Sequence, residues 1–383
     1  MPVRLSMPMA VPERPAPLVL VTTPVEGQPF GSHAAVAADA KRLLAAELSR
    51  RLGRLGAAVA PLPAAGPEGF HWGRWFAAGA RAALERADGA VDAIGYVGGG
   101  ALPLLADDAL DTLLSPIPAE VVANNRFSAD AFVVAGDLPA AIDTLASCDS
   151  DNAAPRRLSE AGFAWRDLGA APWARFDVDT TLDLALLRVA GRLEGTRSLP
   201  DPVRGFLEMA RLPGGRALEV PHLGRIGEVI RDREAELVVA GRVPGVTTAE
   251  LETETACRVR VFVEERGMRS ARRGAPPRSL LAAFMERTSP AELIAELCAL
   301  GDAVVLDTRV LMAARAGSAD ASDWPPEEER LASDFADAGL VATPWLRELT
   351  EAAAQAPVPV LCGGHALVSD GLRIIVRSAW QGR

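Results

Sequence analysis

The chain has 383 residues, of which 49% are hydrophobic and 23% are charged, and its formal net charge is −10. This apolar content excludes a globally disordered chain, and the excess of acidic residues argues against a broad nucleic-acid-binding surface. Because domains commonly contain about 100–200 residues, the length predicts two domains, each large enough to bury its own core.

The sequence lacks the features of a membrane or secreted protein. No apolar run reaches the ~18–20 uncharged residues that span a bilayer. Residues 1–20 contain charges and several prolines in place of the apolar centre of a signal peptide. We therefore expect a cytoplasmic protein with no membrane partner. Four cysteines lie far apart without a Cys-x-x-Cys pair, which predicts isolated buried thiols: Cys148, Cys257, Cys298 and Cys362.

Positive charge is carried almost entirely by arginine, because Lys41 is the only lysine in the chain. Together with the abundance of alanine, this bias is typical of a G+C-rich genome. It also has a chemical consequence. Phosphate recognition must rest on arginine, backbone N–H groups or a metal ion, with Lys41 as the single lysine that could contribute.

Apolar runs and helical periodicity predict alternating strands and helices through the first half of the chain. Strands are expected at residues 17–22, 57–62, 91–97, 120–123 and 131–135. One helix is expected to carry Leu44, Leu48, Leu52 and Leu55 on a single face, and others to cover residues 75–86, 106–114, 140–145 and 182–193. This alternation is typical of an α/β fold, with a mostly parallel sheet and helices on both faces.

Residues 197–215 are rich in proline and contain paired glycines, which predicts a linker with one short helix. Beyond it the alternation restarts, so we expect two successive α/β domains, at residues 1–199 and 216–383, joined near residues 200–215. Strands are expected at residues 236–240, 258–263, 303–306, 358–361 and 372–376. Helices are expected to open at Thr247 (a capping box with Glu250), Ser289-Pro290 and Thr343-Pro344, and residues 327–330 to form a solvated helix start.

Three loops of the first domain follow predicted strands, where open α/β sheets bind ligands. The loop at residues 24–31 contains Gly27 and could present N–H groups to a phosphate, although a plain connector is the simpler interpretation. The glycines 98–100 indicate either a close approach to a ligand or a tight turn. Asp177 and Asp179 would share one face of an extended segment and suit Mg²⁺. One of them could instead cap the next helix, although a following threonine could cap it equally well.

Two motifs resemble those of the nucleotide-diphospho-sugar transferase superfamily, which has the GT-A fold. They are Tyr96-Val-Gly-Gly-x-x-Leu-Pro-Leu-Leu105 and Phe176-Asp-Val-Asp-Thr-x-x-Asp-Leu184, preceded by a strand, a Pro-Val-x-Gly loop, a helix and a second strand. Roughly residues 15–195 are similar to guanylyltransferases that act on 2-phospho-lactate or molybdopterin, and to bacterial glycosyltransferase-like proteins.

The resemblance implies roles for particular residues. Nucleotide binding would fall to Gly27, Gly98, Gly99 and Gly100, and the metal, Mg²⁺ or Mn²⁺, to Asp177 and Asp179. Catalysis would involve Asp130 and Asp179, and acceptor binding Asn124, Asn125 and Arg126.

Two departures from the family pattern bear on these roles. Residues 28–35 contain no lysine or arginine where the family holds a triphosphate, and His33 is the only cation there. The family also has an acidic metal ligand before Pro-Leu-Leu, where this chain has Gly100 or Ala101. The domain could therefore use other metal ligands, or have lost nucleotidyl transfer.

The segment 124–130 lies where this fold binds its acceptor. Two amides, the guanidinium of Arg126 and the carboxylate of Asp130 could bind a phosphorylated or polyol molecule. A simple turn is the alternative, since asparagine and serine are ordinary turn residues. Arg126 and Asp130 are not, and they favour the site.

Several chemically capable residues of the second domain also follow predicted strands, and could converge at one sheet edge: Arg242, Asp307, Arg309 and His365. The two arginines and the histidine would make an anion site, and Asp307 could serve as a metal ligand or base. A lone histidine is more often structural, although the glycines before His365 favour a function. The basic stretch 266–278 could close over an anion or be a solvated loop.

Together these patterns predict a nucleotide-dependent transferase that uses Mg²⁺ and takes a nucleotide and a small, anionic acceptor as partners, but no nucleic acid. A homodimer is left open. The alternative is a degenerate GT-A domain with a regulatory or binding role, beside a phosphoester-type activity or anion site in the second domain. A purely structural interaction protein is a third hypothesis, and the glycines at strand ends argue against it.

Overall fold

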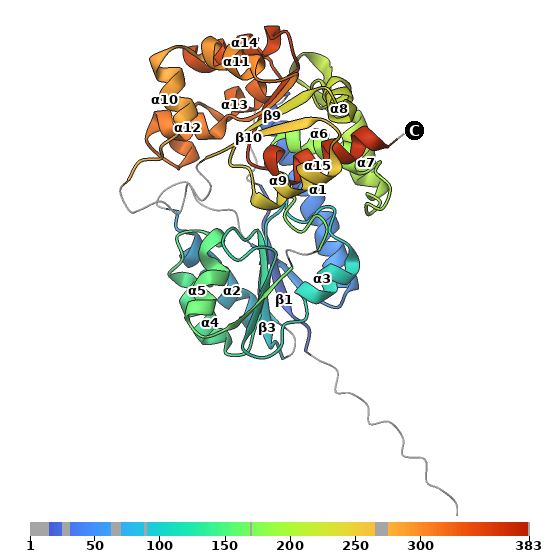
Figure 1. The fold of residues 1–383 in the computed structure, drawn as a ribbon. Coiled ribbons are helices and arrows are strands. Elements are labelled where there is room, and N and C mark those ends of the chain that lie inside the picture. Colours follow the sequence, from blue (N-terminus) through green and yellow to red (C-terminus); the bar gives the residue numbers. More distant parts are fainter. Residues whose placement is uncertain are drawn as a thin grey trace, which may run out of the picture. The chain divides into compact units, whose positions relative to one another are not determined.

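The computed structural model describes residues 15–24, 31–62, 70–87, 90–168, 171–264 and 275–381. The chain divides into two compact units (Figure 1). The first unit consists of Met1–Thr23, Leu48–Gly98 and Asp107–Ala170, and the second of Pro24–Glu47, Gly99–Ala106 and Ala171–Arg383.

The first unit is built on a six-stranded sheet in the order β2-β1-β3-β5-β4-β6. Its strands are β1 (Leu18–Val21), β2 (Ala58–Pro61), β3 (Ala93–Val97), β4 (Glu120–Ala123), β5 (Ala131–Ala135) and β6 (Ala164–Asp167). All neighbours pair in parallel except β5, which runs antiparallel to both β3 and β4. The expected α/β class with a mostly parallel sheet is therefore confirmed.

Helices flank this sheet on both sides. Figure 1 shows α2, α4 and α5 on one side and α3 on the other. Their bounds are α2 (Trp72–Arg86), α3 (Asp107–Leu113), α4 (Leu138–Ala146) and α5 (Ala154–Glu160), which follows the 3₁₀ turn η1 (Asp151–Ala153). An aromatic cluster fills the core under α2, where the Trp72 ring stacks on Phe76 at 5.2 Å and meets Tyr96 edge-on at 5.3 Å.

The second unit contains a four-stranded parallel sheet in the order β10-β9-β11-β12. Its strands are β9 (Glu236–Gly241), β10 (Arg258–Val263), β11 (Ala303–Asp307) and β12 (Val360–Gly363). Successive residues of β9 enter opposite cores: Leu237 and Val239 belong to one, and Val238 and Ala240 to the other. This is the two-residue period of a strand that is buried on both faces.

The helices of the second unit cover both faces of this sheet (Figure 1). One layer consists of α10 (Leu280–Arg287), α11 (Pro290–Ala299), α12 (Arg309–Ala316), α13 (Glu327–Asp334) and α14 (Pro344–Gln355). The other consists of α6 (Thr181–Ala190), α7 (Asp201–Met209), α8 (Leu223–Arg231), α9 (Gly245–Glu254) and α15 (Leu372–Trp380). The short turns are η2 (Pro213–Gly215), η4 (Ala321–Asp323), η5 (Ala338–Leu340) and the π-helical η6 (Leu367–Gly371).

The division into units does not follow the predicted boundary near residues 200–215. That segment is no open linker, because α7 buries Val203 and Leu207, and the hairpin of β7 (Arg211–Leu212) and β8 (Arg216–Ala217) buries Leu212. It is a packed part of the second unit. The long helix α1 (His33–Arg54) also contributes Ala40 and Leu44 to the core of that unit.

Two local predictions are wrong. Residues 372–376 form the start of α15, not a strand, because Leu372, Ile375 and Ala379 are buried at helical spacing. Helix α9 begins at Gly245 after Pro244, so Thr247 lies inside it and makes no capping box with Glu250. By contrast, the Ser289 side chain does cap α11, accepting a hydrogen bond from the Glu292 N–H.

No helix in the described part of the chain is long and apolar enough to cross a membrane. Three of the four cysteines, Cys148, Cys257 and Cys362, are buried as expected, and Cys298 is half-buried.

Candidate functional site

The Phe176–Leu184 motif forms the turn into α6. Thr180 is the N-cap, and its Oγ1 accepts a hydrogen bond from the Asp183 N–H at 3.2 Å. In return, Asp183 Oδ2 accepts from the N–H groups of Asp179 and Thr180, at 3.0 and 2.7 Å, and from the Thr180 hydroxyl at 2.9 Å. This capping box provides hydrogen-bond partners for the N–H groups at the start of α6. Neither Asp177 nor Asp179 therefore serves as the N-cap.

Asp183 differs from the other aspartates of the motif because its side chain is buried, with 3% of its surface exposed. Burial, together with the nearby charge of Asp179, raises the pKa of Asp183 to about 7. This carboxyl therefore changes its charge near neutral pH while it holds the turn in place.

The glycine segment after β3 lies against this turn. The Val178 N–H donates to Gly100 O at 3.0 Å, and Ala101 forms an isolated antiparallel bridge with Asp177. A Cβ at Gly100 would lie 2.3 Å from Val178 O, so only glycine fits there. The close approach of the two backbones is sufficient to explain why glycine stands at position 100. It also brings together the two motifs that carry the resemblance.

The other predicted nucleotide-binding glycines are placed differently. Gly99 belongs to the second unit with Gly100, whereas Gly98 belongs to the first unit, where its N–H donates to Asp130 O at 2.8 Å. Gly27 lies outside the described residues.

Lys41 lies on α1 and points its ammonium group at the motif. Its Nζ is 3.1 Å from Asp179 Oδ1. Burial would lower the pKa of Lys41, but the carboxylates of Asp179, Asp177 and Asp183 outweigh it and hold the pKa above its ordinary value. The only lysine of the chain is therefore a charged ammonium ion within a group of three acidic residues.

The start of α1 is bound by another carboxylate. The N–H groups of His33 and Ala34 donate to the two oxygens of Glu328, at 2.8 and 3.0 Å. A negative charge is favourable at this end of a helix. The helix start predicted at residues 327–330 is confirmed, since α13 begins at Glu327, but the carboxylate of Glu328 is bonded to backbone N–H groups of α1 rather than merely solvated. The first-turn amides that could have faced a phosphate are bonded to the chain itself.

The motif offers few ligands for a metal ion. Within the described ranges, no group of three or more His, Cys, Asp or Glu side chains is placed to hold a metal ion. Mg²⁺, however, is usually bound by one or two carboxylates together with substrate phosphates. Asp177 and Asp179 match that smaller donor set, and Asp179 already binds a cationic group, the Lys41 ammonium. The assignment of Mg²⁺ to Asp177 and Asp179 stays a prediction.

The strand ends of the second unit converge as the sequence predicted. Asp307, at the end of β11, is fully buried and accepts from Arg242, which follows β9, through Nε at 2.6 Å and Nη2 at 3.0 Å. Gly241 permits this contact, because its φ of +125° disfavours side chains and a Cβ would lie 2.4 Å from Asp307 Cβ. Although burial alone would raise the pKa of Asp307, the charge and hydrogen bonds of Arg242 hold it below its ordinary value.

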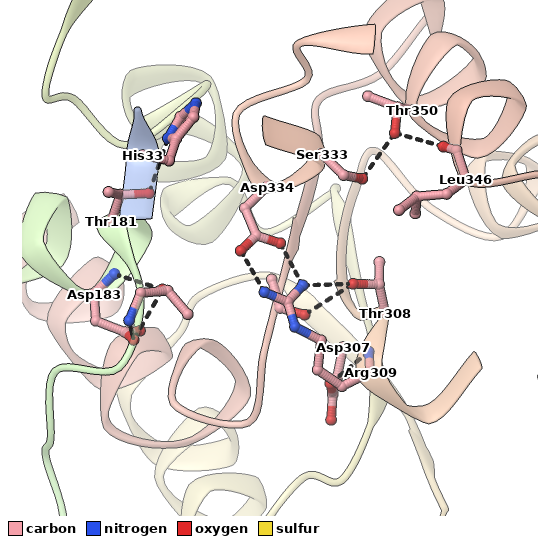
Figure 2. A network of polar contacts seen from close by, with 12 residues as sticks. His33, Thr181, Asp183, Asp307, Thr308, Arg309, Ser333, Asp334, Leu346 and Thr350 are labelled. Carbon is pink, nitrogen blue, oxygen red and sulfur yellow. Dashed lines mark hydrogen bonds and ion pairs between the residues drawn. The ribbon is translucent and has the colours of Figure 1, made fainter. Parts of the chain in front are cut away.

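A second buried pair, Arg309 with Asp334, lies beside Asp307 (Figure 2). Arg309 donates to both oxygens of Asp334, from Nη1 and Nη2, each at 2.6 Å, and Nη1 also donates to the Thr308 hydroxyl at 2.9 Å. The charge of Asp334, with smaller contributions from Asp307 and Asp183, keeps the pKa of Arg309 raised despite its burial. Both arginines of the predicted anion site therefore make bidentate hydrogen bonds to carboxylates.

His365 follows β12 and is exposed, and its charge contributes to the low pKa of Asp307. All four predicted residues of this sheet edge therefore lie near one another. The edge also adjoins the start of α6, because a Cβ at Gly363 would lie 2.8 Å from Leu182 Cδ2. Figure 2 shows Thr181 and Asp183 beside the Arg309–Asp334 pair. The two candidate groups belong to one unit, although the sequence predicted separate domains for them.

The residues predicted to bind the acceptor lie in the first unit and are engaged with one another. Asn124 is buried and closes its loop: its Oδ1 accepts from the N–H groups of Asp130 and Ala131, and its Nδ2 donates to Asp130 Oδ2. Asn125 Oδ1 accepts from the Phe127 N–H. These bonds account for both amides as loop-forming residues, and the acceptor role stays a prediction.

The Arg126 guanidinium lies over the Phe127 and Trp165 rings, 5.7 and 5.9 Å from their centroids, and donates to Ser159 Oγ at 3.3 Å. It is anchored by cation–π contacts.

Comparison with protein-family models, with curated proteins and with solved structures finds no match to this chain.

Sequence reasoning missed three participants in this site, Asp183, Glu328 and Asp334. Asp183 could have been found from the Thr180-x-x-Asp183 spacing, which is a capping-box pattern. The partners of Glu328 and Asp334 are distant in sequence, and no local pattern indicates them.

Proposed function

We propose that this chain is a nucleotide-dependent transferase that moves a nucleotidyl or glycosyl group to a small anionic acceptor. It would bind phosphate together with Mg²⁺ at Asp177 and Asp179. The observation that carries the proposal is the junction of the two GT-A-like motifs. The Val178 N–H bonds to Gly100 O at 3.0 Å, and the only lysine of the chain lies on Asp179.

In this proposal, Asp177 and Asp179 hold the metal ion, which neutralises phosphate charge when it is bound. The backbone at Gly100 and Ala101 lies alongside Asp177 and Val178. Transferases of this kind act mainly by positioning and charge neutralisation. The mostly parallel α/β sheet of the first unit is compatible with the GT-A resemblance, and the catalytic role of Asp130 stays a prediction.

Calorimetric titration of the full chain with inorganic triphosphate in the presence of Mg²⁺ tests this site without knowledge of the base. Asp179→Asn removes a metal-binding charge but keeps the side-chain volume, and we expect loss of the Mg²⁺-dependent binding. Asp39→Asn is the matched control, because Asp39 lies on the same helix α1, where it pairs with its neighbour Arg42. Unchanged binding in Asp179→Asn would contradict the proposal.

The alternative is a degenerate GT-A domain with a separate anion site, or phosphoester-type activity, at the edge formed by Arg242, Asp307, Arg309 and His365. Convergence of these residues at one sheet edge favours it. Against it, both arginines are already neutralised by buried carboxylates, which reduces their attraction for an anion.

The variant His365→Ala separates the two functions, because His365 is exposed and its loss leaves the buried ion pairs intact. If the sheet edge is the anion site, this variant weakens binding of inorganic phosphate and Asp179→Asn does not. The primary proposal predicts the reverse pattern.

A further inference from the structure

We propose that a small cavity between α9 and α15 binds a zwitterion of the size of a small α-amino acid. The two helices pack against each other within the second unit (Figure 1), and the cavity between them has a volume of about 60 Å³. One water molecule needs ~10–15 Å³ of cavity volume, so the space holds about four to six groups of that size. This site goes beyond the proposed transferase function, which uses other residues.

The cavity is lined by charges of both signs. Two carboxylates come from α9 and two guanidinium groups from α15: Glu250, Glu254, Arg373 and Arg377. In each helix the two charged residues are four positions apart and therefore lie on one face. The buried side chains of Leu251 and Val376 add apolar surface to the lining. A ligand in this cavity thus meets acidic, basic and apolar groups together.

Two contacts join α9 to α15 beside the cavity. Arg373 Nη2 lies 2.6 Å from Glu250 Oε1, and both side chains are about one quarter exposed, at 25% and 26%. Four residues further along α9, the Trp380 indole N–H donates to Glu254 O at 2.7 Å. The cavity is therefore formed before a ligand arrives, so binding costs little rearrangement of the chain.

The other two charged groups are available to a ligand. Arg377 is exposed, and its guanidinium lies over the Trp173 ring, 5.1 Å from the centroid. Because Trp173 is buried, this cation–π contact positions the guanidinium without using its N–H donors. Within the described part of the chain, neither the Arg377 guanidinium nor the Glu254 carboxylate forms a hydrogen bond or an ion pair. One cation and one anion without such partners therefore line the same cavity.

These two charges select the class of ligand. A simple anion would be attracted by Arg377 but repelled by Glu254, and a simple cation would experience the reverse. A zwitterion satisfies both, because its carboxylate accepts from the guanidinium while its ammonium group donates to Glu254. In an α-amino acid the two groups are joined through a single carbon atom, and the side chain is left to contact Leu251 and Val376. The volume limits that side chain to a small one, such as that of alanine.

NMR titration of the full chain with L-alanine, observed on the ligand, tests the proposal. L-Alanine is expected to bind saturably with a Kd of about 1 mM or below. Ethylamine and propionate each lack one of its charged groups, and each is expected to bind at least about tenfold more weakly, because one charged group of the protein is left without a partner. L-Tryptophan, whose side chain is too large for the cavity, is expected not to compete with L-alanine.

Two variants connect this binding to the cavity. Arg377→Gln and Glu254→Gln are each expected to lower the affinity for L-alanine about tenfold or more, because a charged hydrogen bond is lost. Glu252→Gln is the matched control, because Glu252 is exposed on α9 but does not line the cavity, and it is expected to keep the wild-type affinity. Thermal unfolding verifies that each variant is folded.

Three results would overturn the inference: no saturable binding of L-alanine, an affinity for ethylamine or propionate equal to that for L-alanine, or wild-type affinity in either Arg377→Gln or Glu254→Gln. If Arg377 and Glu254 pair with each other in solution and exclude the ligand, the first of these results is obtained.

Discussion

Two buried aspartates show how neighbours set the charge of a carboxyl group in this protein. Asp183 is 3% exposed and Asp307 is fully buried. Burial, together with the negative charge of Asp179, raises the pKa of Asp183 to about 7, whereas the charge and hydrogen bonds of Arg242 overcome burial and lower the pKa of Asp307. Burial acts in the same direction on both, so the charge of the neighbour decides the outcome.

The raised pKa of Asp183 predicts a specific dependence of stability on pH. Between its unfolded pKa, near 4, and its folded pKa of about 7, the native state binds the proton more tightly than the unfolded chain does. Asp183 therefore favours folding at low pH, and this contribution is lost as the pH rises through about 7. Asp183→Asn keeps an oxygen that can accept the capping-box hydrogen bonds but cannot ionise.

We expect the free energy of unfolding of Asp183→Asn, relative to the wild type, to be about 2–3 kcal/mol higher at pH 8 than at pH 5, since one pKa unit corresponds to about 1.4 kcal/mol. Urea denaturation of both proteins at the two pH values, without metal, measures this difference. An identical difference at both pH values would show that Asp183 does not titrate in this range.

The Arg309–Asp334 pair is predicted to be costly to break. Arg309→Met would leave the Asp334 carboxyl buried and unpaired, and we expect a loss of about 3–5 kcal/mol in the free energy of unfolding. Arg204→Met in the exposed Arg204–Asp201 pair is the control, and it is expected to cost under about 1 kcal/mol. Urea denaturation measures both. Equal, small losses would mean that the interior pair contributes no more than the surface pair.

At the scale of elements, the contact between the Gly100 segment and the turn before α6 is the feature on which the proposed site depends. Gly100→Ala would place a Cβ 2.3 Å from Val178 O, and we expect it to destabilise the protein by about 1–3 kcal/mol. Gly53→Ala is the control, because Gly53 is in an exposed part of α1 with nothing within 4 Å of a Cβ.

Thermal unfolding of the two glycine variants tests this prediction. Gly53→Ala is expected to raise the free energy of unfolding by about 0.5–1 kcal/mol, whereas Gly100→Ala lowers it. Wild-type stability in Gly100→Ala would show that the segment does not pack against Val178.

Most elements could be predicted from sequence because their signals are local. The strands β4 and β5 have the predicted bounds, and the N-caps at Ser289 and Thr343 open α11 and α14 as expected. The failures share a cause. The apolar run at 372–376 is too short for its period to separate a strand from a buried helix. β6, with the sequence Ala-Trp-Arg-Asp and partly exposed residues, carries little apolar signal.

At the scale of the whole molecule, the division into units could not be predicted from chain order. Helix α6 buries nearly all of its residues and packs into the core of the second unit, although it precedes the proline-rich segment taken for a linker. A boundary drawn from composition detects turns and prolines, but it does not detect which core an apolar helix enters. The convergence of Arg242, Asp307 and His365 was predictable, because parallel strands end at one edge.

The observed division into units also changes the interpretation of the site. The aspartates of the GT-A-like motif and the charged strand ends were expected in different domains, yet they lie in one unit, where Asp183 is one of the carboxyl groups that raise the pKa of Arg309. The shortage of lysine has a structural counterpart, since the single lysine is placed on Asp179. The central proposal is therefore that this unit binds a phosphorylated ligand together with a divalent metal ion.

Thermal unfolding of the full chain with a panel of nucleotides and nucleotide sugars, each with Mg²⁺ and again with a chelator, tests that claim most directly. A ligand that binds only the folded state raises the melting temperature. We predict a rise with at least one nucleotide or nucleotide sugar in Mg²⁺, and its loss in the chelator and in Asp179→Asn. A melting temperature that no member of the panel changes in Mg²⁺ would contradict the account.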